Sequence, residues 1–258
     1  MQIVREFHYL WADIRSIGNI KSKSKFIMKK LGLIGGMGPQ STVPYYLNIV
    51  YGMREKVAPD FFPNLTIESL NVFEILKLIG AGEYEKVLNL FLYALENLKN
   101  SGCEIAALTA NTAHIVFDEL IKRSPLPLVS IVESTCAEAK LRGYSKVVLL
   151  GTNFTMERDF YKKPFIREGI EIVIPEPEER KFIDNRIVSE LEMGVVKDST
   201  RQDFIKIISR LKSEEQADAL ILGCTELPLI LSDDTSPLPC LDTVKIHSDA
   251  LINASLES

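Results

Sequence analysis

Two short stretches of the 258-residue chain combine side chains that can move a proton with side chains that can hold a carboxylate. The first, at 108–114, reads Leu-Thr-Ala-Asn-Thr-Ala-His, and the second, at 221–227, reads Ile-Leu-Gly-Cys-Thr-Glu-Leu. Each closes an apolar run typical of a buried strand and passes at once into a helix-like segment. Because open α/β sheets bind ligands at the carboxyl ends of their strands, the two stretches predict one cleft lined from two sides.

Cys224 is the sharpest single candidate for chemistry. A thiol between a strand end and a helix N-terminus has its thiolate favoured by the helix dipole, and a thiolate can act as base or nucleophile. The competing interpretation is a buried structural cysteine, because free cysteine is among the most buried residue types. Thr225 can donate a hydrogen bond to a carboxylate, and Glu226 can orient or deprotonate a neighbour, although both residue types are also common at helix starts.

The first stretch offers a matching set of polar groups without a thiol. Asn111 and Thr112 can donate hydrogen bonds to a ligand from the opposite side of the expected cleft. His114, taken alone, is interpreted as a satisfied hydrogen-bonding residue rather than as a catalyst. Ala110, which directly precedes Asn111, carries only a methyl group.

A glycine-rich turn follows the first strong apolar strand, at 30–35, and reads Gly-Gly-Met-Gly-Pro-Gln-Ser-Thr over 35–42. Backbone amides in such a turn, here those of Met37 and Gly38, can approach a phosphate or carboxylate at the start of the next helix. The spacing only approximates the dinucleotide-binding fingerprint, and Pro39 removes one donor. As a nucleotide-binding motif this turn is therefore weak, and the residues leave both phosphate and carboxylate open as its ligand.

Alternating strands and helices must position these groups. The pattern predicts an α/β fold of two pseudo-symmetric, doubly wound parallel-sheet lobes with the active site in the cleft between them. Thr155 follows the expected fifth strand and is expected to cap the next helix. The expected domains are a 1–27 extension, a first lobe of 28–127 plus 234–258, and a second lobe of 128–233. Strands are expected at 30–35, 64–69, 104–108, 128–131, 146–151, 170–174, 218–223 and 238–243, and helices at 42–55, 84–100, 112–122, 133–141, 155–167, 179–193, 201–212 and 244–256.

Composition narrows the classes of partner. The net charge of -5 argues against nucleic acid and anionic membrane surfaces, which reward clustered Lys and Arg, and favours a small-molecule ligand. Four cysteines without C-x-x-C spacing and only three histidines predict neither a disulfide framework nor a metal site. No apolar run reaches the roughly 20 residues of a membrane span, so a cytoplasmic protein is expected. Met28 is expected to be the functional start, with the alternative that residues 1–27 form a short surface helix.

The motifs taken together resemble the aspartate/glutamate racemase family, in particular its broad-specificity amino-acid racemase-like members. The resemblance covers about residues 28–256, and the motifs occur in the same order as in the family. It is carried by Gly-Gly-Met-Gly-Pro at 35–39, Asn-Thr-Ala-His at 111–114, Gly-Thr at 151–152 with Thr-Met at 155–156, Gly-Cys-Thr-Glu-Leu at 223–227, and Asp-Thr at 242–243 with Ile-His at 246–247.

The resemblance implies an amino-acid racemase, an isomerase that uses no cofactor and no metal. Two thiols on opposite faces of the substrate α-carbon would remove and return the proton, and Cys224 would be one of them. The carboxylates of an amino acid or dicarboxylate would be held by the backbone of Met37 and Gly38, by the side chains of Asn111, Thr112, Thr155 and Thr225, and with the help of Glu226. A homodimer is among the assemblies that the resemblance allows.

The sequence departs from the family pattern at Ala110, where members carry Cys or, in some cases, Thr. A methyl group cannot transfer a proton, and Cys103 precedes the strand, far from the cleft. An engineered inactivating change, a natural member with one working base, and a divergent member with another reaction are all compatible with this position. Aspartate-specific members also carry a basic residue in the region of 69–75, and none occurs here, so the substrate side chain stays open.

Three other functions stay open from sequence. A relative with one thiol, such as an arylmalonate-type decarboxylase, would protonate a planar intermediate on one face. A catalytically silent protein would keep the cleft only to bind an amino acid. A nucleotide-binding enzyme is the fourth reading, carried by the glycine-rich turn alone.

Overall fold

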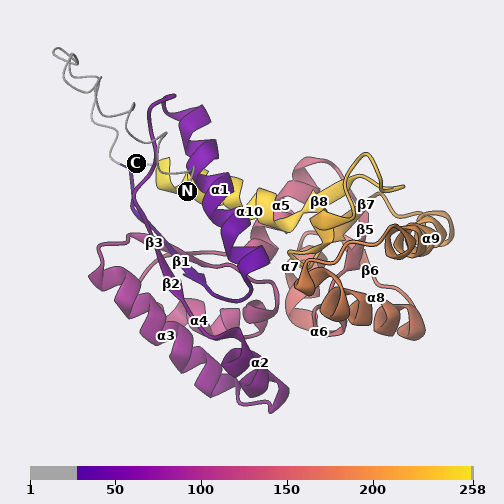
Figure 1. Ribbon diagram of the computed structural model, residues 1–258, viewed down its shortest axis with the longest axis horizontal. Helices are drawn as coiled ribbons and strands as arrows, with labels where there is room; N and C mark the ends of the chain where they lie inside the picture. Colours follow the sequence, from indigo (N-terminus) through magenta and orange to yellow (C-terminus); the bar gives the residue numbers. More distant parts are fainter. Residues whose placement is uncertain (1–27, 257–258) are drawn as a thin grey trace, which may run out of the picture.

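Two four-stranded, fully parallel sheets form the centre of the fold, one in each lobe (Figure 1). The computed structural model describes residues 28–256, so the expectations for residues 1–27 lie outside the described residues. The strand orders are β2-β1-β3-β4 and β6-β5-β7-β8. The strands are β1 Leu31–Gly35, β2 Leu65–Ser69, β3 Ile105–Leu108, β4 Leu128–Val129, β5 Lys146–Leu150, β6 Glu171–Val173, β7 Ala219–Leu222 and β8 Cys240–Asp242.

Helices cover the sheets and connect their strands (Figure 1). The expected α/β class with two doubly wound lobes is confirmed by these two parallel sheets and their helices. The α-helices are α1 Pro39–Lys56, α2 Val72–Gly80, α3 Tyr84–Asn100, α4 Phe117–Arg123, α5 Ile131–Leu141, α6 Asn153–Glu157, α7 Asp159–Arg167, α8 Pro177–Ser189, α9 Asp198–Glu215 and α10 Thr243–Leu256. Within residues 28–256 there are also the 3₁₀ turns η3 Thr112–Val116, η4 Leu191–Met193 and η5 Leu227–Leu229.

The central strands are continuous apolar runs because both of their faces are covered. Every residue of β1, β3 and β7 is buried, as expected for parallel sheets that have helices on both sides. β3 and β7 occupy the same place in their respective sheets, each between the first strand of its sheet and an edge strand. Ala110 and Cys224 each lie two residues beyond the end of these strands, so they hold equivalent positions in the two lobes.

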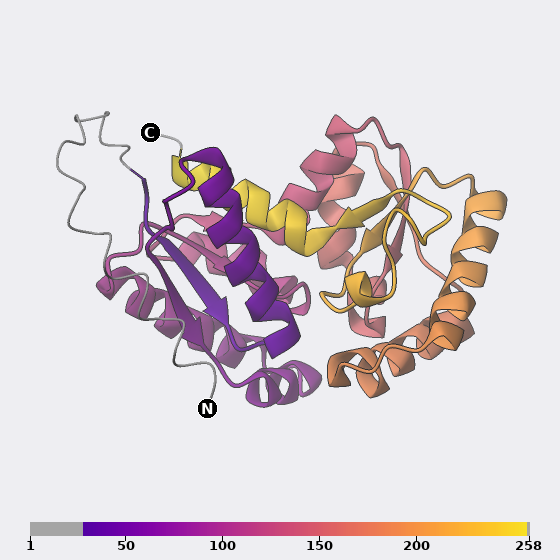
Figure 2. The same cartoon turned by 45° about the horizontal axis from the view of Figure 1, so that its top comes forward.

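The chain crosses between the sheets at two places. β4 pairs with β3, and β8 pairs with β7, so the crossings fall near Ser130 and Thr243 instead of at 127/128 and 233/234. The first expected boundary lies close to its crossing, but the second was placed too early, because the short edge strand β8 belongs to the second sheet and carries little sequence pattern. Figure 2 shows α10 running from the second sheet to lie beside α1 of the first lobe.

Several elements differ from the expectations. Residues 72–80, expected as loop, form α2, which Asn71 caps by accepting a hydrogen bond from Phe73 N–H at 3.1 Å. The helix expected over 155–167 is two helices, because Arg158 has an extended backbone (φ -82°, ψ 144°) that interrupts it. No helix among residues 28–256 is long and apolar enough to cross a membrane.

Candidate active site

Cys224, Thr225 and Glu226 form a hydrogen-bonded trio at the carboxyl end of β7. The Cys224 thiol donates to Glu226 Oε2 at 2.8 Å, and the Thr225 hydroxyl donates to the same oxygen at 2.9 Å. Gly223 must precede them as glycine, because a Cβ there would lie 2.7 Å from the carbonyl oxygen of Leu150. The close approach of these two strands therefore fixes where the thiol emerges.

The environment of Cys224 favours the thiol over the thiolate. Burial, and then the negative charge of Glu226, raise the pKa of Cys224 well above its usual value. The expectation that a helix dipole would favour the thiolate is wrong, because η5 is a 3₁₀ turn of three residues and not an α-helix. Cys224 therefore keeps its proton and donates it in the hydrogen bond to Glu226 Oε2.

The glycine-rich turn of the first lobe approaches this trio. Gly38 has a positive φ of 110°, and a Cβ built on it would lie 3.7 Å from Glu226 Oε1. The side chain of Ser41, in the first turn of α1, donates a hydrogen bond to the carbonyl of Thr109, which ties this turn to the loop that carries Ala110. Among residues 28–256 the amides of Met37 and Gly38 have no hydrogen-bond acceptor, so both are available to an anion.

Threonine hydroxyls meet across the boundary between the lobes. Thr112 Oγ1 of the first lobe lies 3.5 Å from Thr155 Oγ1 of the second, and Thr152 Oγ1 lies 3.2 Å from Thr155 Oγ1. The expectation that Thr155 caps this helix is wrong. Thr152 is the cap, because its hydroxyl accepts a hydrogen bond from the Thr155 amide at 3.4 Å. The Thr155 side chain, buried in α6, is thereby free to face the first lobe.

Asn111 connects to the second lobe through Thr243. Its Nδ2 donates to Thr243 Oγ1 at 3.3 Å, and that hydroxyl donates to the carbonyl of Leu222 at 2.9 Å. Asn111 is 4% exposed, and its Oδ1 has no hydrogen-bond partner among the described residues. This chain of bonds joins the loop of Ala110 to the last residue of β7.

Two buried histidines hold the first crossing between the lobes. His114 Nδ1 donates to the carbonyl of Ala110 at 3.0 Å, and its Nε2 accepts from the amide of Ile131 at 3.3 Å. His247 Nε2 donates to the carbonyl of Val129 at 3.0 Å, and its Nδ1 accepts from the Tyr45 hydroxyl at 2.7 Å. Since both ring nitrogens of each histidine are occupied, neither is placed to exchange a proton with a ligand.

Burial also decides the charge of these histidines. It lowers the pKa of His114 to about 4. It lowers the pKa of His247 to about 3, with a smaller contribution from His114. Both rings are therefore neutral at pH 7, which agrees with the one donor and one acceptor that each uses.

Glu192 is a residue near the site that the sequence did not reveal. Although Glu192 as a whole is exposed, partial desolvation of its carboxyl group, and then the charges of Glu226 and Asp184, raise its pKa. It follows α8 in a 3₁₀ turn that has no recognisable motif, so no sequence signal pointed to it. Among residues 28–256 no group of three or more His, Cys, Asp or Glu side chains could hold a metal ion.

Cys103 lies away from all these groups. It is buried, precedes β3, and donates to the carbonyl of Leu31 at 3.5 Å, at the amino end of the first sheet. This position is opposite to the strand ends where Ala110 and Asn111 lie.

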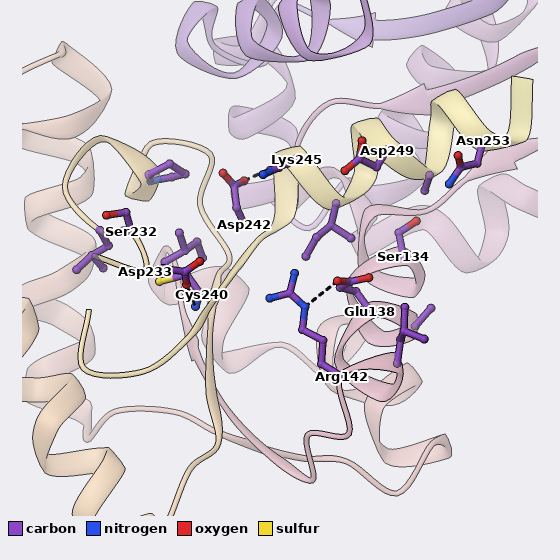
Figure 3. A pocket seen from close by; sticks show the side chains of 17 residues that line it. Ser134, Glu138, Arg142, Ser232, Asp233, Cys240, Asp242, Lys245, Asp249 and Asn253 are labelled. Carbon is purple, nitrogen blue, oxygen red and sulfur yellow. Dashed lines mark hydrogen bonds and ion pairs between the residues drawn. The ribbon is translucent and has the colours of Figure 1, made fainter. Parts of the chain in front are cut away.

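A cavity of about 620 Å³ lies between α5, the start of α10 and the loop that precedes β8 (Figure 3). α5 and α10 line it with charged side chains, among them the ion pair of Arg142 with Glu138 at 2.7 Å. It includes Leu222 and Asp242 but none of the sequence-predicted site residues. The candidate chemistry is therefore separate from this cavity.

Comparison with known proteins identifies the family. Residues 34–251 match the family model described as Asp/Glu/Hydantoin racemase. The chain belongs to this family. The broad specificity amino-acid racemase RacX of Bacillus subtilis is 27% identical over 222 residues, which cover 83% of this chain and 92% of that protein.

Solved structures of this racemase family share the fold. An aspartate racemase homologue from Pyrococcus horikoshii is 36% identical with a TM-score of 0.80, covering 89% of this chain and 100% of that one. The aspartate racemase of Picrophilus torridus is 26% identical with a TM-score of 0.67, covering 88% and 94%. The relatives are thus amino-acid racemases and their homologues, with the same two-lobe architecture.

Proposed function

We propose that this member of the racemase family acts on amino acids without a cofactor and moves the α-proton with Cys224. The single observation that carries the proposal is the 2.8 Å hydrogen bond from the Cys224 thiol to the buried Glu226 carboxylate. Cys224 would pass its proton to Glu226 and then take the α-proton of the substrate, and the same steps in reverse would return it. This pair acts on one face of the α-carbon.

Among residues 28–256, the matching strand end of the first lobe offers no thiol that would complete inversion. Ala110 holds the position equivalent to Cys224, and the nearby His114 is neutral and bonded at both nitrogens. We therefore propose that the chain exchanges the α-hydrogen from the Cys224 side and inverts the centre slowly. Cys103, at the other end of the sheet, does not substitute for the missing base.

Binding of the substrate carboxylate would use groups at the strand ends of both lobes. The free amides of Met37 and Gly38 lie at the start of the 18-residue helix α1, where the helix dipole favours an anion. The hydroxyls of Thr112, Thr155 and Thr225 would add hydrogen bonds from both lobes. Holding the carboxylate in a dry site would help acidify the α-hydrogen, which is the difficult step of the reaction.

The protonated state of Cys224 favours a second candidate function. A thiol whose pKa is raised by burial and by Glu226 suits the protonation of a planar intermediate on one face, as in a one-thiol decarboxylase. Exchange of the α-hydrogen of an amino acid in heavy water, followed by NMR, separates the two: the racemase-type reaction requires exchange, and the decarboxylase predicts little.

Restoring the second base is the direct test. Ala110→Cys should raise the racemisation rate by about 10²–10⁴-fold in a chiral assay over a panel of amino acids, because that is the usual contribution of one positioned proton-transfer group. Ala110→Ser is the matched control, since it adds a small polar group of much weaker acidity. An Ala110→Cys protein that folds, binds an amino acid and shows no gain would exclude position 110 as a proton-transfer site.

A further inference from the structure

Thr243 contacts both halves of the candidate site from the second crossing. It is the first residue of α10 and is fully buried. Its hydroxyl bonds to Leu222, at the end of the strand that precedes Cys224, and to Asn111, which follows Ala110. One hydroxyl group therefore links the two strand ends where the chemistry is placed.

Donor and acceptor roles in this chain follow from the chemistry of its groups. A carbonyl oxygen can only accept, so the single hydroxyl hydrogen of Thr243 is directed to Leu222. The Thr243 oxygen can then only accept a hydrogen bond from Asn111. The NH₂ group is the part of the amide that can donate one, so it must face Thr243. The N and O atoms of an asparagine amide are nearly indistinguishable by shape, so the orientation of the Asn111 amide is assigned from this hydrogen-bond network.

The orientation leaves the oxygen of Asn111 without a donor. Asn111 Oδ1 is buried and unpaired among residues 28–256. A buried acceptor without a partner is costly, so it needs an explanation, and a donor supplied by a ligand is one. In an amino acid the α-ammonium group has only donors to offer, whereas a carboxylate has only acceptors and would be repelled by Oδ1.

A carboxylate approaches the glycine-rich turn, which is itself tied to the loop of Asn111. The Glu226 carboxylate, 6% exposed, approaches Gly38, and Ser41 ties that turn to Thr109, two residues before Asn111.

We infer that Thr243 is a positioning residue that turns the Asn111 amide so that its oxygen accepts a hydrogen bond from the α-ammonium group of the substrate. The inference rests on the proposed function, because it assumes that an amino acid occupies the cleft. It also changes the role that the family resemblance implies for Asn111, from a donor to a carboxylate into an acceptor for the ammonium group.

Binding of paired probes tests this role without any turnover. Glutamate and glutarate differ only in the α-ammonium group, and so do lysine and 6-aminohexanoate. In the unaltered chain at least one amino acid should bind about 10–100-fold more tightly than its deaminated partner, as measured by titration calorimetry, since hydrogen bonds to charged groups have this strength.

Two variants at one position separate orientation from packing. Thr243→Val keeps the shape but removes the hydroxyl, so the Asn111 amide can turn, and the preference for the amino acid should fall to about threefold or less. Thr243→Ser keeps the hydroxyl and should retain the preference. A preference that is unchanged in Thr243→Val, a preference near one in the unaltered chain, or no binding of any of the four probes would each overturn the inference.

A measurement on the unaltered chain covers the case in which Thr243→Val does not fold. NMR should find the side-chain NH₂ protons of Asn111 protected from exchange with water in the unliganded protein, because one of them is bonded to Thr243. Exchange as fast as that of a free asparagine would overturn the inference. Failure of the proposed function is distinguishable, because Ala110→Cys can fail to racemise while the preference that depends on Thr243 persists.

Discussion

The two buried histidines predict a loss of stability in mild acid that can be assigned to named residues. In the unfolded chain each ring has an ordinary pKa of 6.5, whereas in the folded chain the pKa is about 4 for His114 and about 3 for His247. The unfolded state therefore binds more protons as the pH falls below 6.5. The stabilisation is fully present above that value and is lost as the pH falls toward the folded pKa values.

The magnitude follows from the same pKa values. Between pH 7 and pH 5 each histidine should lower the free energy of unfolding by about 2 kcal/mol, because the unfolded ring becomes protonated while the folded ring stays neutral. Replacing His247 by Gln keeps one donor and one acceptor near Val129 and Tyr45 but removes the titrating group. We therefore expect His247→Gln to lose about 2 kcal/mol less than the unaltered protein over this pH range.

Urea denaturation at pH 5, 6 and 7 measures the effect. Tyr45→Phe is the matched control, since it removes the hydroxyl that bonds to His247 Nδ1 but leaves the ring buried. Its stability should be lower at every pH, and most of the pH dependence of the unaltered protein should persist, because burial is the largest cause of the lowered pKa of His247. Equal pH dependence in His247→Gln and the unaltered chain would refute the reasoning, because burial would then not hold this ring neutral.

Two further predictions concern the thiols and the glycine-rich turn. Cys224→Ala should abolish α-hydrogen exchange in heavy water, whereas Cys103→Ala should leave it nearly unchanged because Cys103 lies at the far end of the sheet; exchange that survives in Cys224→Ala would remove Cys224 from the mechanism. Gly38→Ala should lower the free energy of unfolding by about 1–3 kcal/mol, because φ is 110° there. Gly80→Ala, where no atom lies within 4 Å of the added Cβ, should be neutral or slightly stabilising in the same urea assay. A neutral Gly38→Ala would show that the turn adapts.

Periodicity was enough to predict the architecture but not its short elements. Buried parallel strands such as β3 and β7 are continuous apolar runs, and the apolar spacing of α3 marks one face of a long helix, so both could be read from sequence. The nine-residue α2 was missed although Glu74 and Lys77 keep helical spacing, because a segment this short gives only about two turns of pattern. The two-residue strand β4 was assigned to the wrong sheet, since its pairing with β3 depends on tertiary contacts.

The site was predictable where a motif carried it and not where a contact did. The position of Cys224 beside Glu226 followed from sequence neighbours. The state of the thiol did not, because it depends on burial and on the 3₁₀ turn that follows. Thr243 and Glu192 interact with segments that are far away in the sequence. Local sequence patterns do not predict such tertiary contacts.

The two lobes share a scaffold but differ in the groups that can exchange protons. β3 and β7 end at equivalent places, yet the second lobe contributes a thiol and two carboxylates, Cys224, Glu226 and Glu192, each close enough to influence the others. The first lobe contributes Ala110, the amide of Asn111 and backbone donors. His114, which bonds to Ala110 and Ile131 next to this loop, is held neutral by burial, which lowers its pKa to about 4. Proton transfer from one lobe and hydrogen bonding from the other follow from this difference, and a single thiol at position 110 is the smallest change that would make the two faces alike.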